Sequence, residues 1–399
     1  MRSFGTDGVP IAGGLAGTLA RGESRAFFAR VSMDGTLEGG ATFDPSRQGD
    51  AFRSVVELGD GDFIAVGYAN VSATEVSDHQ VLVVRIHPDG TQDWSQTYGP
   101  TEMSSGINFA TEFAADVAVS PTGRLFVLGG TRSGFPGATG ESGGAFVMEI
   151  DRNDGTVRWA RDLSARSRGS LMVASADAIY VVLSGGGGDT PLDLGAAGTF
   201  DIEPSSEQAI IVALSQTDGA PTAAYLVPGA PSSSVESLEL DDEGLLFSAS
   251  RYIYTPTEGT RYRGGFVYVA SPAVTDARVI AQVDQSTVSA TSAVRTSSGD
   301  VLVTGSVGSE FQGEAVPGYR AGRDLWMVLF DRHGRQRFHK FDGDGVAYET
   351  MRAVRGSGDR VFLYGYYTGM FRFETQSIAT GAGSTFGGCG YLMGATIAE

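Results

Sequence analysis

The chain has little of several residue types on which common chemistries depend. Among its 399 residues there is a single cysteine, Cys389, so no disulfide can form within the chain. There are 4 histidines, and they do not have the spacing of a zinc site. Neither a G-x-S-x-G elbow nor an H-E-x-x-H motif occurs. The sequence therefore lacks the usual signatures of serine hydrolases and zinc enzymes.

Long apolar runs and basic clusters are also missing. No apolar stretch approaches the ~18 residues needed to cross a bilayer, and the first residues lack the basic and apolar regions of a signal peptide. The chain has 47 acidic and 29 basic residues, a formal net charge of −18. Because nucleic-acid binding depends on a basic surface that neutralises phosphates, we expect no nucleic-acid partner and no membrane span.

Glycine is abundant, with 57 residues, and it recurs in a repeated pattern. The pattern is a turn followed by a short apolar strand that ends near glycine, with a period of about 54 to about 66 residues, which suits four-stranded propeller blades. It is found seven times along the chain, at residues 8–14, 61–68, 123–130, 177–184, 244–250, 299–306 and 358–366.

A second apolar strand follows each copy, and in most units a tight Asp-Gly or His-Gly turn comes next. We predict a positive φ at the turn glycines, because this hairpin turn favours left-handed backbone there. An aromatic residue four positions later, Trp94, Trp159 or Phe338, is expected to be a packing residue that covers the outer rim of the blade core. The predicted core between neighbouring sheets includes Val66, Val83, Val127, Val147, Val181, Val212, Val303 and Val328.

One further strand opens each unit, which gives four strands per unit and no sustained helical period. We therefore predict an all-β fold, a seven-bladed β-propeller of mostly four-stranded antiparallel blades in a single domain over residues 1–399. The expected blades are approximately residues 1–46, 47–102, 103–166, 167–230, 231–284, 285–343 and 344–399. The last strand, Gly390 to Ile397, has no outer strand after it, so we expect strand addition there by a partner or a second copy.

The repeats resemble those of the bacterial seven-bladed β-propeller repeat proteins of the SBBP type. The best matches are VLVTGSVGSEFQ from Val301 with LWMVLFDRHG from Leu325, and AFVMEIDRNDGTVRW from Ala145. The resemblance covers nearly the whole chain and implies the propeller fold and a secreted or cell-surface location. It implies no particular activity. The chain departs from the pattern at Leu183, where glycine is usual, and in the fifth unit, which lacks the Asp-Gly turn.

The loops between the second and third strands are long and rich in glycine, with embedded aromatic and acidic residues. Long ordered loops on a rigid scaffold are where binding residues concentrate. The predicted binding residues are Asp78, His79, Tyr252, Tyr254, Tyr262, Tyr366 and Tyr367. The acidic loop of the fourth unit supplies a candidate calcium site at Asp189, Asp193 and Asp201, and no other cofactor is expected.

Two classes of function fit these features. We expect a non-enzymatic binding or scaffold protein that recognises a protein or glycan partner through the face formed by the long loops, because no catalytic constellation is visible. The alternative is an enzyme of lyase or glycoside hydrolase type with an axial-pocket site, in which carboxylates and Tyr or His groups carry the chemistry.

Overall fold

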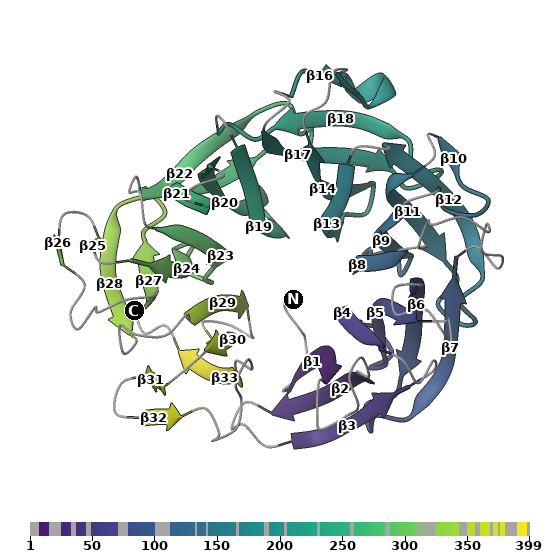
Figure 1. The fold of residues 1–399 in the computed structure, drawn as a ribbon, viewed down its shortest axis with the longest axis horizontal. Helices are drawn as coiled ribbons and strands as arrows, with labels where there is room; N and C mark the ends of the chain where they lie inside the picture. The colour runs from purple at the N-terminus through teal and green to yellow at the C-terminus, as the bar shows by residue number, and fades with distance from the viewer. Residues whose placement is uncertain are drawn as a thin grey trace. The chain divides into compact units, whose positions relative to one another are not determined.

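The structure is a computed structural model, almost all of it β-strand (Figure 1). It describes residues 8–15, 25–32, 37–44, 49–70, 79–99, 112–131, 134–140, 143–164, 167–186, 191–202, 206–229, 232–255, 259–283, 288–308, 310–311, 314–315, 324–342, 349–355, 360–367, 370–373, 376–379 and 389–396. The chain divides into two compact units, mainly residues 6–205 with 210–226, and residues 206–209 with 227–399. In the described residues no helix is long and apolar enough to span a membrane.

The first unit contains sheets whose strands follow one another in chain order. The first sheet is β1 (Gly8–Leu15), β2 (Arg25–Ser32) and β3 (Leu37–Phe43), and the second is β4 (Ala51–Glu57), β5 (Phe63–Asn70), β6 (His79–Ile86) and β7 (Gln92–Tyr98). The third is β8 (Phe113–Val119), β9 (Leu125–Thr131), β11 (Gly144–Ile150) and β12 (Val157–Ser164), with β10 (Thr139–Gly140) added outside β12.

The fourth sheet is β13 (Ser167–Ala174), β14 (Ala178–Gly186), β17 (Glu207–Ser215) and β18 (Pro221–Leu226). A small pair, β15 (Leu192–Asp193) and β16 (Thr199–Phe200), and the short 3₁₀ turn η1 (Gly195–Ala197) precede β17.

The second unit repeats this arrangement. Its sheets are β19 (Ser232–Asp241), β20 (Gly244–Thr255), β21 (Gly259–Ala270) and β22 (Ala277–Val283), and then β23 (Ser289–Arg295), β24 (Val301–Val307), β27 (Asp324–Phe330) and β28 (Gln336–Asp342). The last sheet is β29 (Glu349–Arg355), β30 (Arg360–Tyr367) and β33 (Cys389–Thr396). Two small pairs are β25 (Glu310–Phe311) with β26 (Glu314–Ala315), and β31 (Met370–Phe373) with β32 (Gln376–Ala379).

The predicted fold class is confirmed: the chain is an all-β propeller built from mostly four-stranded antiparallel sheets. The closure into seven blades stays a prediction. In the described residues β33 pairs with β30 along one edge, and no strand is paired with its other edge. Ile397 lies outside the described residues, so strand addition at Gly390 to Ile397 also stays a prediction.

Apolar side chains between neighbouring sheets form the core of each unit, as the repeat predicts. All eight predicted core valines are buried: Val66, Val83, Val127, Val147, Val181, Val212, Val303 and Val328. Glycine occurs at the end of the strand motif for a steric reason. A Cβ on Gly129 would overlap the backbone oxygen of Phe113 and the ring of Phe146. At the departure from this motif, Leu183 is buried in the hydrophobic core of the third and fourth sheets.

The turn between the third and fourth strands of a sheet packs against the outer strand of the sheet before it. Gly155 has φ +77° and Gly219 has φ +69°, which confirms the predicted left-handed turns. A Cβ on Gly155 would lie 2.9 Å from Trp94, and one on Gly219 would lie 2.6 Å from Trp159. The two tryptophans are therefore packing residues, as predicted, and they contact the turn of the next sheet. The side chain of Phe338 lies outside the described residues.

The fifth unit shows how a turn forms without the Asp-Gly pair. Val274 takes the position of the glycine with φ +54°, and its side chain is fully buried. A β-branched residue in this conformation is strained by roughly 1–2 kcal/mol. Burial of the valine side chain contributes a stabilisation of similar size, which offsets the strain.

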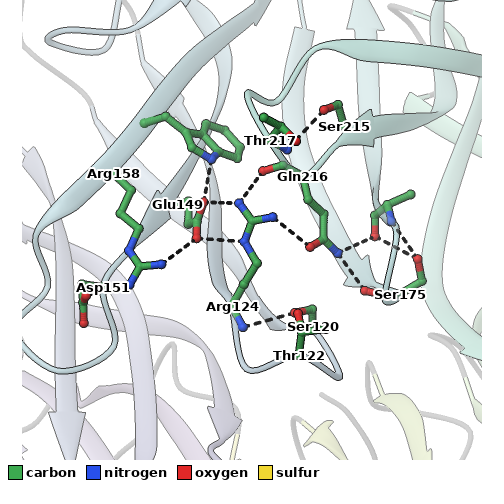
Figure 2. A network of polar contacts seen from close by, with 12 residues as sticks. Ser120, Thr122, Arg124, Glu149, Asp151, Arg158, Ser175, Ser215, Gln216 and Thr217 are labelled. Atoms are coloured by element: carbon green, nitrogen blue, oxygen red, sulfur yellow. Dashed lines mark hydrogen bonds and ion pairs between the residues drawn. The ribbon is translucent and has the colours of Figure 1, made fainter.

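A network of charged groups also joins the third and fourth sheets at the end where these turns lie, hereafter the turn end (Figure 2). Glu149, at 2% exposure, accepts hydrogen bonds from Arg124, from Arg158 and, at 2.7 Å, from Trp159 Nε1. Arg124 also donates to the backbone oxygen of Gln216 at 2.7 Å. Gln216 in turn donates to the backbone oxygen of Ser175 at 2.8 Å. The network therefore links β11 and β12 of the third sheet, through Arg124 just before β9, to the turns that follow β13 and β17 of the fourth sheet.

Substitution of Gly155 by alanine should destabilise the first unit by about 2–4 kcal/mol. The new Cβ adds the strain of a positive φ to the overlap with Trp94, Gln96 and Tyr98. Gly61→Ala is the matched control, because Gly61 has φ +90° but nothing within 4 Å of the new Cβ. Urea denaturation measures both variants. Equal losses in the two would show that backbone strain, and not packing against the preceding sheet, determines the cost.

Substitution of Glu149 by glutamine should cost about 3–5 kcal/mol, because it leaves Arg124 without its buried counter-charge. The control is Asp151→Asn, which removes the more exposed partner of Arg158 and should cost less than about 1 kcal/mol. Thermal unfolding by circular dichroism compares the two variants. If Glu149→Gln lowered the stability by no more than Asp151→Asn does, the structural role of the network would be contradicted.

Candidate functional site

At the opposite end of the sheets, hereafter the loop end, the second and third sheets carry buried acids. Asp50 directly precedes β4 and Glu112 directly precedes β8, and both are fully buried. Asp50 Oδ1 accepts a bond from the backbone N–H of Asn70 at 3.1 Å, and Glu112 Oε1 accepts one from Thr131 Oγ1 at 3.1 Å. The backbone N–H of Glu112 donates to the backbone oxygen of His79 at 3.1 Å. The first two contacts hold the loop end of each sheet, and the third joins the two sheets there.

A β-bulge beside this cluster changes the direction of one side chain. The pairing of β4 with β5 shifts between Phe52 and Ser54, so Arg53 is the additional residue of the bulge. Bulges reorient side chains and are common beside functional sites. Arg53 is exposed. The corresponding bulge residues of the later sheets are small or polar: Ala115, Ser170, Glu236 and Thr291.

Arg53 contacts two aromatic rings and no acid. Its Cζ lies 4.3 Å from the ring centroid of Phe113 and 5.6 Å from that of Tyr68. In the part of the chain that the structure describes, no carboxylate lies within ion-pair distance of this guanidinium. Partial burial against the rings lowers the pKa of Arg53 and the nearby Tyr68 opposes this, but an arginine still stays protonated at neutral pH. The result is an accessible cation whose position is set by aromatic contacts.

Next to this cation, Tyr68 and His79 form a ring pair. Tyr68 lies on β5 and His79 begins β6, and their ring centroids are 4.5 Å apart with an interplanar angle of 33°. Both side chains are partly exposed. Histidine and tyrosine side chains both serve as proton donors and acceptors in enzymes. Arg53, Tyr68, His79 and Phe113 therefore combine an anion-binding group with an acid–base pair; together they are the candidate site.

Of the predicted binding residues, the structure places only His79 in this site. Asp78 lies outside the described residues. Tyr252, Tyr254 and Tyr262 belong to the second unit, on the long hairpin of β20 and β21, in which Tyr252 is opposite Tyr262.

The hydroxyl of Tyr252 donates to Glu207 Oε2 at 3.3 Å. Tyr366 and Tyr367 end β30, and their side chains lie outside the described residues. No described contact gathers these tyrosines into one site.

The candidate calcium site is only partly described. Asp193 ends β15, and its Oδ1 accepts a bond from the backbone N–H of Gly195 at 2.9 Å, an ordinary turn contact. Asp201 is exposed and Asp189 lies outside the described residues. The described residues contain no group of three or more His, Cys, Asp or Glu side chains that could hold a metal ion. Calcium at these three residues stays a prediction.

Sequence reasoning missed Arg53, Tyr68 and Phe113. A signal was present in the repeats, because Arg53 occupies a position where the next four units have Ala, Ser, Glu or Thr. Its exposure depends on the bulge, and its contact with Phe113 depends on how the second and third sheets pack. Neither feature can be obtained from spacing along the chain.

No family model matches the chain, and no curated protein matches its sequence. Similar solved structures include the Dos1 propeller, at 12% identity over 85% of this chain and 77% of that one, with a TM-score of 0.46. The periplasmic gluconolactonase of Pseudomonas aeruginosa is 13% identical over 81% of each chain, with a TM-score of 0.44.

The PQQ-bound aldose sugar dehydrogenase of Streptomyces coelicolor is 12% identical over 78% of this chain and 87% of that one, with a TM-score of 0.39. The expectation of a non-enzymatic binding or scaffold protein is therefore corrected, because the similar structures include enzymes. With TM-scores below 0.5 the likeness assigns neither reaction nor substrate, and any such assignment depends on the residues of the site.

Proposed function

We propose that this chain is an enzyme of the lyase type, which breaks a C–O bond by elimination beside a carboxylate. The observation that carries the proposal is the Tyr68–His79 ring pair next to Arg53, an accessible guanidinium with no acidic partner in the described residues. Elimination requires a cation for the carboxylate, a base for the neighbouring C–H and an acid for the leaving oxygen. The site supplies these three groups.

The substrate carboxylate binds to Arg53, whose planar guanidinium forms two parallel hydrogen bonds with it. This charge contact acidifies the C–H bond beside the carboxylate. His79 accepts that proton, the electron pair of the C–H bond forms a C=C bond, and the C–O bond at the next carbon breaks.

The departing oxygen receives the proton of the Tyr68 hydroxyl. The products are an unsaturated carboxylate and an alcohol. Transfer of the proton from His79 back to Tyr68, directly or through water, restores the starting state, so no oxidant or other reactant is consumed.

The other enzyme class, glycoside hydrolysis, fits this site less well. That reaction commonly uses two carboxyl groups that face the sugar from opposite sides. Asp50 and Glu112, the two acids of the loop-end cluster, are fully buried and accept hydrogen bonds from protein groups. They therefore position the loop ends and do not face a substrate.

We also propose that the chain belongs with the SBBP-type repeat proteins and is secreted or displayed at a cell surface. The support is the repeat pattern at Val301, Leu325 and Ala145, together with the propeller fold.

The test is turnover of a panel of acidic polysaccharides, including polygalacturonate and alginate, followed by the ultraviolet absorbance of the new C=C bond. His79→Gln and Tyr68→Phe should each lower kcat by about 10²–10⁴-fold, because each removes one proton-transfer group. Tyr68→Phe keeps the ring beside Arg53. His339→Gln is the control, an exposed histidine on β28 in the second unit.

Two results would refute the proposal. One is the absence of turnover across the whole panel. The other is full activity of both His79→Gln and Tyr68→Phe.

A further inference from the structure

A second accessible cation lies two strands away from Arg53 in the first unit. The inner strands β4, β8 and β13 are neighbours in that order, because Asp116 of β8 contacts both of the others (Figure 1). Its Oδ1 accepts a bond from Ser54 Oγ of β4 at 2.6 Å, and its Oδ2 accepts one from the backbone N–H of Met172 of β13 at 2.7 Å. Arg168 is the second residue of β13 and is exposed.

The pairing of each inner strand with its neighbour places Arg168 at the loop end. In three successive sheets the inner strand has an equivalent pairing near its loop end. Arg168 is opposite Ser184 on β14 in the fourth sheet. The equivalent pairs are Phe113 with Gly130 of β9 in the third sheet and Ala51 with Tyr68 of β5 in the second. Arg168 therefore occupies in its sheet the position that Phe113 occupies in the sheet before it. Phe113, whose ring contacts Arg53, lies on the strand between the two arginines.

Arg168 differs from three arginines at the turn end. Arg85, Arg124 and Arg158 each form ion pairs with aspartates or glutamates. No described carboxylate lies within ion-pair distance of Arg168. Two such arginines, Arg53 and Arg168, lie on either side of β8.

We infer that Arg168 binds a second carboxylate of the substrate, so that the substrate is an oligomer of acidic sugars and not a single acidic sugar. This inference rests on the proposed function of the Arg53 site. The net negative charge repels such a ligand at long range, but screening limits that repulsion to about 8 Å at physiological ionic strength. Direct contacts with the two guanidinium groups then determine the affinity.

The position of Arg168 assigns it to substrate binding and not to the proton transfers. The chain's acid–base pair, Tyr68 and His79, lies on β5 and β6 of the second sheet, whereas Arg168 lies on the first strand of the fourth. Loss of Arg168 should therefore raise KM for acidic oligomers and leave kcat nearly unchanged.

The experiment measures binding by calorimetry in the full chain carrying His79→Gln, which prevents turnover. The probes are tetragalacturonate, tetraguluronate, the monomer galacturonate and a neutral galactotetraose. In this background Arg168→Gln should weaken binding of at least one acidic tetramer by about tenfold, and leave binding of the monomer unchanged. The control is Arg332→Gln, which removes an exposed arginine of a turn in the second unit.

The outcomes separate this inference from the proposed function. A tenfold loss of affinity that Arg168→Gln causes only for an acidic tetramer supports the second subsite. This holds even if the wild-type chain turns over no member of the panel, and that result refutes only the lyase reaction. Acidic and neutral tetramers bound equally well would overturn the inference, whether or not the chain is a lyase. The inference would also be overturned if Arg168→Gln left the affinity for the acidic tetramers unchanged. The same holds if Arg332→Gln weakened their binding as much as Arg168→Gln does.

Discussion

The contact between each turn glycine and the outer strand of the preceding sheet sets the spacing on which the other features depend. In the first unit Gly155 lies against Trp94 and Gly219 against Trp159, and in the second unit Gly334 lies against the backbone oxygen of Ile280. A side chain at any of these three glycines would push neighbouring sheets apart, whereas the turn of the fifth unit has the buried side chain of Val274 at this position. The apolar faces between sheets would then lose the close contact from which their stability derives.

The two ends of the sheets differ in how their polar groups are used. At the turn end, Arg124 and Glu149 satisfy each other and link two sheets. A group that is bonded in this way has no capacity left for a ligand. At the loop end the buried acids Asp50 and Glu112 hold the backbone, and the cations beside them stay accessible. Stability is therefore concentrated at one end, and the proposed chemistry at the other.

Much of the fold could be predicted from the sequence, because the repeated residues reflect local requirements for turns, buried strands and packing. Turn glycines, core valines and the tryptophans of the outer strands each follow from pattern and spacing, and the structure places them as expected. Of the candidate site, only one residue was identified from the sequence. His79 was identified from its loop, but its partner Tyr68 was not, because that pairing depends on the register of β5 with β6. The tyrosines Tyr252 and Tyr262 were chosen for their exposure in a loop, whereas they are part of a long hairpin.

The bulges in the inner strands β4, β8, β13, β19 and β23 also affect how such a protein can diverge. The residues on either side of a bulge pair with consecutive residues of the next strand, and the bulge residue itself has no partner in the pairing. Strand pairing therefore constrains the bulge residues less than their neighbours: Arg53, Ala115, Ser170, Glu236 and Thr291. Mutations at these positions leave the ladder intact while they change the charge and size presented at the inner strands. Duplication of the repeat thus provides independently variable positions within each unit, and substrate preference can evolve there with little loss of folding stability.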